Sequence, residues 1–155
     1  MLAKKTLYFC SKNSFLSNFY PAGFRAEGKR YATVEHYFQS QKTTDRVRAE
    51  TIRLAESPLR AKRLGGYVGL RPGWERIKED VMMQGLRLKF ANPIMCAKLL
   101  QTRNLKLVED SPCDFYWGGR GNGLNRLGSL LMKLRKELRD GQYEKGGRHS
   151  NKQKP

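Results

Sequence analysis

The sequence predicts a single, mainly α-helical domain of the α+β class, in which the strands are few and short. Three observations indicate the single domain and its helical content. A chain of 155 residues with 39% hydrophobic and 10% aromatic side chains is long enough for one compact domain with a real core. Several segments place apolar residues at helical spacing between helix start and stop signals. Internal repeats are absent, so we expect one domain over residues 1–140.

The first strands are expected near the start of the chain. Thr6 to Cys10 is rich in β-forming residues and predicts a short strand. Residues 14–21 form a loop dense in aromatic side chains. Phe24 to Tyr31 alternates weakly around Gly28, which is typical of a hairpin.

Three helices with local start signals are expected next. Thr33 is a plausible N-cap for a helix from Val34 to about Thr43. A second helix runs from about Asp45 to Glu56. Ser57-Pro58 has the residue types of an N-cap and first helical position, and the short helix that they begin ends at Gly65-Gly66.

The second half of the chain predicts the longest helix and a strongly amphipathic closing helix. Trp74 opens the longest helix, which runs to about Phe90 with Ile77, Val81 and Leu88 in its apolar stripe. A further helix starts at Asn92-Pro93 and runs to about Leu100. A short strand is expected at 105–108, and Leu127 to Arg139 closes the domain with Leu130, Leu131, Leu134 and Leu138 facing inward. Gly141 ends that helix, and we expect 141–155 to be a basic flexible tail.

The net charge of +17 is unusual for a domain of this size. The tail from Gly141 to Pro155 carries four basic residues and one acidic residue, so the body retains +14. A field of that strength favours polyanions or phosphorylated ligands, and DNA or RNA are candidate partners. A generally solvated basic surface is the other interpretation.

Cysteine and histidine usage argues against a disulfide framework and a metal site. Cys10, Cys96 and Cys113 are widely spaced, without a CxxC pair, which fits a reducing cytoplasm. His36 and His149 are too few for a histidine-rich cluster. The longest apolar runs are far short of the roughly 18 residues of a membrane-spanning helix. We therefore expect a cytoplasmic protein without metal, cofactor or membrane partner.

Residues 113–128 combine a carboxylate, three consecutive aromatics and a loop of four glycines that leads into a helix. Glycine allows positive φ and close approach of a ligand to the main chain. A loop that feeds a helix N-terminus can bind an anion such as phosphate, and Asn125 can cap the helix. A glycine-rich turn between two core elements is the alternative, because the loop fits no nucleotide-binding motif.

Glu35 is a candidate for acid–base chemistry. On the helix from Val34 it shares one face with Phe38 and Lys42, because spacings of three and four keep residues in line. A carboxyl group on a face with an aromatic ring can be partly desolvated, and desolvation suits it to proton transfer. The alternative is an ordinary surface glutamate.

The order of short motifs along the chain resembles the YbiA-like, or NADAR, family. The resemblance extends from about Asn13 to Leu138, and its most specific parts have the form EHYFQ, DxYWG and NRLG. The motifs are Ser17-Asn18-Phe19, Glu35-His36-Tyr37-Phe38-Gln39, Gln41-Lys42, Ser57-Pro58, Trp74, Lys89-Phe90, Leu107-Val108-Glu109, Asp114-Phe115-Tyr116-Trp117-Gly118, Asn125-Arg126-Leu127-Gly128 and Leu130-Leu131-Met132.

The resemblance implies a compact YbiA-like helical domain and metal-independent N-glycosidase chemistry at a ribose C1–nitrogen bond. By position, Glu35 matches the glutamate of EHYFQ, Trp74 the tryptophan of W-E-x-x-K, and Asp114 the aspartate before YWG; these are the expected catalytic residues. The expected substrate-binding residues also match by position. They are Asn18, Phe19, Lys42, Trp117, Gly118, Asn125 and Arg126.

Two substrates follow from the resemblance: ADP-ribosylated guanine in DNA or RNA, and phosphorylated intermediates of riboflavin biosynthesis. The charge of the body favours the first, because neutralising phosphates releases counterions. Two departures from the family pattern bear on substrate choice. The loop after Trp117 is shorter and lacks an acidic residue, and Gly65-Gly66 stands where Gly-Arg is usual. The alternative function is a non-catalytic basic nucleic-acid-binding module.

Overall fold

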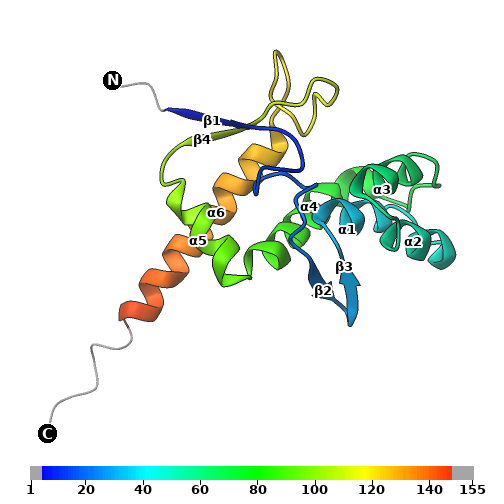
Figure 1. The fold of residues 1–155 in the computed structure, drawn as a ribbon, viewed down its shortest axis with the longest axis horizontal. Coiled ribbons are helices and arrows are strands. Elements are labelled where there is room, and N and C mark those ends of the chain that lie inside the picture. Colours follow the sequence, from blue (N-terminus) through cyan, green and yellow to red (C-terminus); the bar gives the residue numbers. More distant parts are fainter. Residues whose placement is uncertain (1–4, 148–155) are drawn as a thin grey trace, which may run out of the picture. The chain divides into compact units, whose positions relative to one another are not determined.

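The computed structural model describes residues 5–147, and within them the chain forms six helices and four short strands (Figure 1). These residues group into two compact units. One unit spans Phe9–Met95, and the other combines the residues up to Tyr8 with those from Cys96 onward. The prediction of a mainly helical chain with a few short strands is confirmed.

The Phe9–Met95 unit contains the expected hairpin. β2 (Phe24–Ala26) pairs antiparallel with β3 (Lys29–Tyr31). The two residues of the turn, Glu27 and Gly28, have φ of 49° and 78°, which is the left-handed pair that a tight hairpin turn requires.

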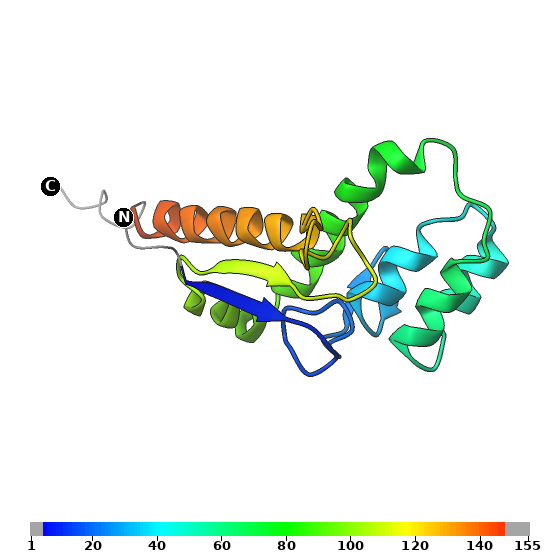
Figure 2. The ribbon, with the colours of Figure 1, turned by 90° about the horizontal axis from the view of Figure 1, so that it is seen from above.

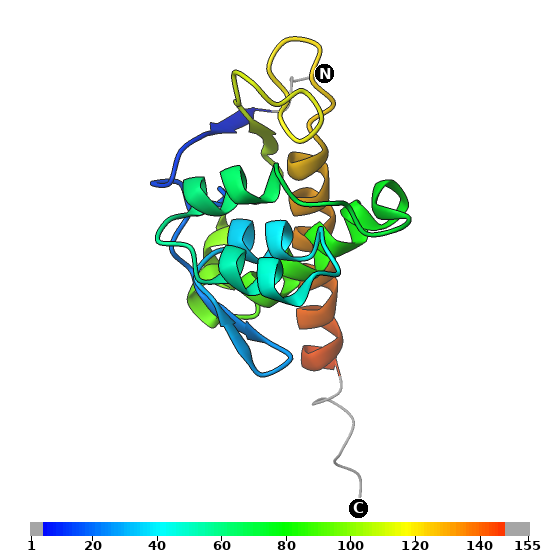
Figure 3. The same ribbon diagram turned by 90° about the vertical axis from the view of Figure 1, so that its right-hand side faces the viewer.

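Four helices complete this unit, and α1 contacts the other three. Figure 3 shows α1 beside α2 and α3. The side chain of Thr33 accepts the His36 amide and that of Ser57 accepts the Arg60 amide, so both predicted N-caps are confirmed. The first two helices end earlier than the sequence predicted. The helices are α1 (Val34–Ser40), α2 (Arg46–Arg53), α3 (Pro58–Gly65) and α4 (Trp74–Phe90).

The predicted apolar stripe of α4 lies at the edge of its buried face. Ile77, Val81 and Leu88 are only half-buried. The face that is fully buried instead carries Met82, Met83, Gly85, Leu86, Lys89 and Phe90. A Cβ on Gly85 would lie 2.9 Å from the Tyr37 ring, so α1 and α4 approach closely at this glycine. This face includes a lysine and a glycine, so the spacing of apolar residues alone does not identify it.

In the other unit, β1 (Thr6–Phe9) pairs with β4 (Lys106–Glu109), and α6 (Arg126–Gly147) lies against β4. Figure 2 shows the two strands pointing the same way with α6 alongside them. A Cβ on Gly128 would lie 2.1 Å from the Leu107 carbonyl oxygen, so only glycine fits where α6 meets β4. The unit also includes the greater part of α5 (Pro93–Gln101), which begins after Asn92 as expected.

α6 is longer than the sequence predicted. It continues past Gly141 to Gly147, so α6 and not α4 is the longest helix of the described residues. Leu130, Leu131 and Leu134 are buried as expected, whereas Leu138 is half-buried. The part of the predicted tail from residue 148 onward, including His149, lies outside the described residues. Among residues 5–147, no helix has the length and apolar character needed to cross a membrane.

A buried arginine fixes α6 to its neighbours. Arg135 is 6% exposed and donates to the Thr102 hydroxyl at 2.8 Å and to the Leu105 carbonyl at 3.0 Å. Burial, with the charge of Arg139 as a smaller cause, lowers the pKa of the guanidinium. These two hydrogen bonds tie the helix to the chain that precedes β4.

Candidate active site

Glu35 is buried, with 6% of its surface exposed. It lies in the first turn of α1, after the Thr33 cap, and its backbone amide donates to the Asn18 carbonyl at 3.1 Å. The side-chain amide of Gln39, one turn later on α1, donates from Nε2 to Glu35 Oε1 at 2.7 Å. The surface alternative for Glu35 is therefore wrong, and the desolvation expected from its helix face is observed.

Gln39 was not predicted as a site residue, yet it fixes the orientation of Glu35. It is 4% exposed, and its Oε1 atom is buried without a hydrogen-bond partner among the described residues. The carboxamide fits against Gly65, where a Cβ would lie 2.0 Å from Oε1. Gln39 follows Glu35 by four residues, and this spacing on a helix is the one sequence signal that could have indicated the pair.

Asn18 lies in a buried turn next to Glu35. Its Nδ2 contacts the Met82 sulfur at 3.4 Å, and its Oδ1 is buried without a hydrogen-bond partner among the described residues. Phe19, the next residue, is half-buried, and its amide donates to the Ser17 hydroxyl at 3.1 Å. The acceptor on Asn18 and the one on Gln39 are thus unused, and a ligand that donates hydrogen bonds could satisfy them.

Lys89 is a second residue that the sequence did not single out for a role. It is 2% exposed, and its ammonium donates to the Ser17 carbonyl at 2.8 Å. The rings of Tyr20 and Phe90 lie 5.7 Å and 5.1 Å from Nζ. Burial lowers the pKa of Lys89 to about 7. The lysine therefore supports the turn that carries Asn18 and can lose its proton near neutral pH.

Trp74 and Lys42 both lie near Phe38. The Trp74 and Phe38 ring centroids are 5.2 Å apart at an angle of 54°, and Trp74 is 5% exposed. The Lys42 ammonium lies 5.7 Å from the Phe38 centroid, which is within the range of a cation–π contact. Trp74 and Lys42 thus both lie against Phe38, which follows Glu35 by three residues on α1. Lys42 itself lies beyond the end of α1, so the prediction that it shares a helix face with Glu35 was wrong.

His36, the neighbour of Glu35, has a structural role. Its Nδ1 lies 2.9 Å from the Thr33 hydroxyl and its Nε2 lies 3.0 Å from the Ala55 carbonyl. A carbonyl can only accept, so Nε2 donates and Nδ1 accepts from the hydroxyl. Both ring nitrogens are occupied, and His36 is not a general base in this arrangement.

Asp114 belongs to the other unit, where it organises a tight turn. Its Oδ1 accepts from the amides of Tyr116 at 3.1 Å and Trp117 at 2.9 Å, which is an Asx-type turn. Its Oδ2 makes no hydrogen bond to the described residues. The indole of Trp117 is half-buried and packs edge-on against Tyr116, with centroids 4.9 Å apart. One carboxylate oxygen holds the turn, and the other is available to a ligand.

The glycine-rich loop is folded upon itself rather than open for an anion. The Gly118 amide donates to the Asp114 carbonyl, and the Gly119 amide to the Glu109 carbonyl. The amides of Gly123, Leu124, Asn125, Arg126 and Leu127 also donate to carbonyls of the loop. Arg120 forms a paired contact with Asp110, with N–O distances of 2.8 Å and 3.1 Å. Of the two interpretations of this loop, the structural turn is the one that the hydrogen bonds support.

Asn125 closes the base of this loop. Its Oδ1 accepts from the Glu109 amide at 3.0 Å and its Nδ2 donates to the Leu107 carbonyl at 2.9 Å. The side chain therefore bonds to β4, in place of the N-cap of α6 that was expected. Its φ of 52° is a backbone conformation that asparagine tolerates better than most residues. Arg126, the next residue, is half-buried at the start of α6.

The predicted site residues thus fall into two sets. The Phe9–Met95 unit contains Asn18, Phe19, Glu35, Lys42 and Trp74. The other unit contains Asp114, Trp117, Gly118, Asn125 and Arg126. Within the first set, hydrogen bonds that join α1 and α4 to the Ser17–Phe19 turn bring together the carboxylate, the unused acceptors and the buried lysine.

Comparison with known proteins gives consistent results. The model of the NADAR domain matches residues 7–139. The N-glycosidase YbiA of Escherichia coli (strain K12) is 46% identical over 127 residues, which is 79% of each chain. A riboflavin biosynthesis protein of Vibrio vulnificus, VVA0006, is 35% identical over 147 residues, which cover 90% of this chain and 40% of that protein. The NMR structure of the E. coli protein YbiA matches 93% of this chain and 90% of its own, with a TM-score of 0.83 at 41% identity.

Proposed function

This chain belongs to the NADAR domain family, and on that premise we propose that it hydrolyses the bond between ribose C1 and a nitrogen of a phosphorylated ribosyl or ADP-ribosyl substrate. Its relatives are named N-glycosidases, so it is a hydrolase that acts on N-glycosyl compounds. The observation that carries the proposal is the buried carboxyl of Glu35, held at 2.7 Å by the Gln39 carboxamide.

Cleavage of a C1–N bond needs charge stabilisation at C1 and a proton on the departing nitrogen. The transition state resembles an oxocarbenium ion, as in glycoside hydrolysis, and two carboxyl groups in different environments suit it. Glu35 is buried beside an amide, whereas Asp114 is half-buried with one oxygen engaged in a turn. We assign proton transfer to Glu35, and contact with the ribose or the attacking water to Asp114.

Gln39 can serve Glu35 in both protonation states. In the observed orientation, Nε2 donates to the carboxylate. After a half-turn of the carboxamide, Oε1 could instead accept from the carboxylic acid, because an amide offers a donor and an acceptor on opposite sides. A residue that satisfies both states allows the carboxyl to exchange a proton without leaving a buried group unpaired.

The remaining predicted residues have supporting roles in this proposal. Trp117 would stack on a flat base or sugar face, a contact worth roughly 1–3 kcal/mol in nucleic-acid complexes. Trp74 would act through the aromatic wall that it forms with Phe38. Lys42 and Arg126 supply positive charge for phosphate oxygens, and Asn18 supplies an acceptor for a substrate hydroxyl or amino group. Asn125 and Gly118 maintain the loop that carries Trp117.

Two substrates fit this chemistry. The name of the Vibrio relative supports an intermediate of riboflavin biosynthesis. The +14 charge of the body supports ADP-ribosylated guanine in DNA or RNA, because a polyanionic substrate gains from counterion release. The wide spacing of the cysteines supports a reducing, cytoplasmic environment for the reaction. A non-catalytic nucleic-acid-binding module is the weaker candidate, because nucleic-acid binding does not explain the buried Glu35–Gln39 hydrogen bond.

The test compares hydrolysis of both substrates by the wild type and by Glu35→Gln. Guanine-ADP-ribosylated DNA and the phosphorylated riboflavin precursor are incubated separately, and free ADP-ribose or ribose phosphate is measured by mass spectrometry. Glu56→Gln is the matched control, because it makes the same change at an exposed glutamate. We expect Glu35→Gln to lose about 10²–10⁴-fold in rate, the usual contribution of general acid–base catalysis.

Each outcome of this test identifies a substrate or rejects the proposal. Release from the DNA alone identifies a nucleobase ADP-ribosyl hydrolase, and release from the precursor alone identifies a metabolic N-glycosidase. Release from neither, with salt-dependent DNA binding that survives Glu35→Gln, would favour the binding module.

A further inference from the structure

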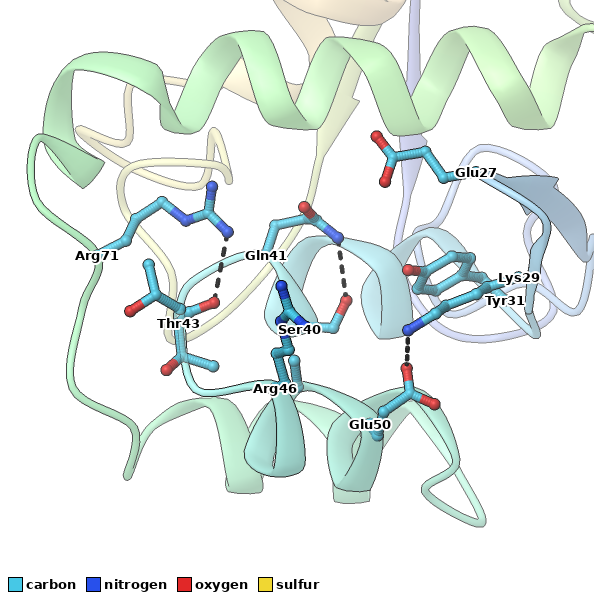
Figure 4. Close-up of a pocket in the computed structure, with 11 residues that line it drawn as sticks. Glu27, Lys29, Tyr31, Ser40, Gln41, Thr43, Arg46, Glu50 and Arg71 are labelled. Atoms are coloured by element: carbon cyan, nitrogen blue, oxygen red, sulfur yellow. Dashed lines mark hydrogen bonds and ion pairs between the residues drawn. The ribbon is translucent and has the colours of Figure 1, made fainter.

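A polar pocket of about 350 Å³ lies within the Phe9–Met95 unit, apart from the residues assigned to catalysis. Figure 4 shows that its lining comes from the β2–β3 hairpin, the end of α1, the start of α2 and Arg71. On α1 it contacts Ser40, which lies about 140° around the helix from Glu35 at 100° per residue. None of the predicted site residues lines it, so it is a separate candidate site.

The pocket lining includes two arginines whose hydrogen-bonding capacity is not used up. Arg71 donates from its backbone to the Lys42 carbonyl at 2.7 Å and from Nη2 to the Thr43 carbonyl at 3.3 Å. Its Nε is buried and has no hydrogen-bond partner. Arg46, the first residue of α2, makes no ion pair with any of the described residues. Both guanidinium groups therefore retain donors for a ligand.

The other end of the pocket is acidic and structured. Glu50 accepts from Lys29 at 2.7 Å and from Arg53 at 2.8 Å, and these two hydrogen bonds lower its pKa to about 2. Glu27, in the hairpin turn, is the second carboxylate of the lining. In Figure 4 both stand away from Arg71, on the opposite side of the pocket. The pocket is thus polar throughout, with Arg71 at one side and two carboxylates beside Lys29 at the other.

We propose that this pocket binds a small phosphorylated polyol, with its phosphate between Arg46 and Arg71 and its hydroxyl groups toward Glu27 and Glu50. Arginine forks match phosphate oxygens in geometry and charge, and carboxylates accept hydrogen bonds from hydroxyl groups. The volume is at the lower end of the range for small-molecule sites, which is about 300–1,000 Å³.

The two carboxylates disfavour a nucleic-acid strand as the main ligand. A strand carries a phosphate on every nucleotide, so a strand that followed the pocket would bring phosphates against Glu27 and Glu50. A single phosphate at one end of a hydroxyl-rich molecule avoids that repulsion. The proposal does not depend on the hydrolysis assigned to Glu35.

Titration calorimetry at constant ionic strength tests this pocket with ribose 5-phosphate, ribose and a short single-stranded oligonucleotide. The proteins are the wild type, Arg46→Ala and the control Arg48→Ala. Arg48 is another exposed arginine of α2, outside the pocket lining, with an ion pair to Asp45 at 3.5 Å. We expect saturable binding of ribose 5-phosphate that Arg46→Ala weakens about tenfold or more, as for a lost charge-assisted hydrogen bond.

The controls separate this site from general charge and from the catalytic residues. Arg48→Ala should bind ribose 5-phosphate like the wild type, and Arg46→Ala should keep any hydrolytic activity that the wild type shows. Equal weakening by both substitutions, or binding that Arg46→Ala leaves unchanged, would overturn the proposal. So would binding of ribose as tight as that of ribose 5-phosphate, or binding of the oligonucleotide alone.

Discussion

Replacing Lys89 by methionine should remove the pH dependence of stability that this buried ammonium imposes. Methionine keeps a straight apolar side chain and removes the charge. Burial lowers the pKa of Lys89 from 10.5 to about 7, so between these values the unfolded chain binds more protons than the folded one. The free energy of unfolding of the wild type therefore rises with pH in this window, and the penalty is complete below about pH 7.

The magnitude follows from the size of the shift. At 1.36 kcal/mol per pH unit, burying the ammonium costs the wild type roughly 4–5 kcal/mol at pH 7 and about 1 kcal/mol at pH 9.5. A methionine at this position carries no charge and has no such desolvation penalty. It leaves the buried Ser17 carbonyl without a hydrogen-bond donor, which lowers the free energy of unfolding by about 1–3 kcal/mol at any pH. We expect Lys89→Met to be the more stable protein at pH 7, and to lose about 3 kcal/mol relative to the wild type by pH 9.5.

The assay is urea unfolding followed by tryptophan fluorescence, at constant ionic strength between pH 6 and 9.5. Subtracting the variant from the wild type cancels the titration of all other groups. Lys136→Met is the control, because Lys136 is an exposed lysine whose side chain is 77% accessible, and its difference should stay nearly flat. A Lys89→Met difference that stayed flat from pH 7 to 9.5, with both proteins folded, would refute the reasoning.

Two further predictions concern packing and the site. Gly128→Ala should lower the free energy of unfolding by at least about 2 kcal/mol, because its Cβ would meet the Leu107 carbonyl. Gly69→Ala, with nothing within 4 Å of its Cβ, should be close to neutral in the same urea assay, and equal effects would contradict the packing argument. Gln39→Met should move the limb of the pH–rate profile set by Glu35 to higher pH by about 1–2 units, because the carboxylate loses a donor that favours its charged form. An unmoved profile with a lower rate would assign Gln39 to packing alone.

Local signals in the sequence were sufficient for most of the secondary structure. Thr33, Ser57 and Asn92 each mark a helix start through a hydrogen bond to an amide two or three residues away, so a short stretch of sequence contains the information. The end of α6 was misjudged because Gly141 was assumed to terminate it, although a single glycine costs a helix only about 1 kcal/mol.

The features that the sequence could not supply depend on contacts between distant segments. The buried state of Lys89 requires the Ser17 carbonyl, 72 residues earlier, and the pairing of Asn125 with β4 bridges 16 and 18 residues. Glu35 and Asp114 were identified from sequence motifs. Only the structure shows that Gln39 donates to the Glu35 carboxylate and that one oxygen of Asp114 is engaged in a turn. A motif therefore identifies which residues are candidates for function, whereas the fold determines which side chains they contact.

The clamp that Asn125 forms on β4 has a consequence for how this protein can diversify. The Asn125 side chain joins the two ends of the segment between Glu109 and Asn125 directly, through the Glu109 amide and the Leu107 carbonyl. Lengthening a surface loop whose ends are already fixed costs little, since the entropy of closure grows only with the logarithm of its length. Insertions and deletions can therefore accumulate around Trp117 while β4 and α6 keep their register. If Trp117 contacts the substrate as proposed, such changes would alter substrate preference at little cost in stability.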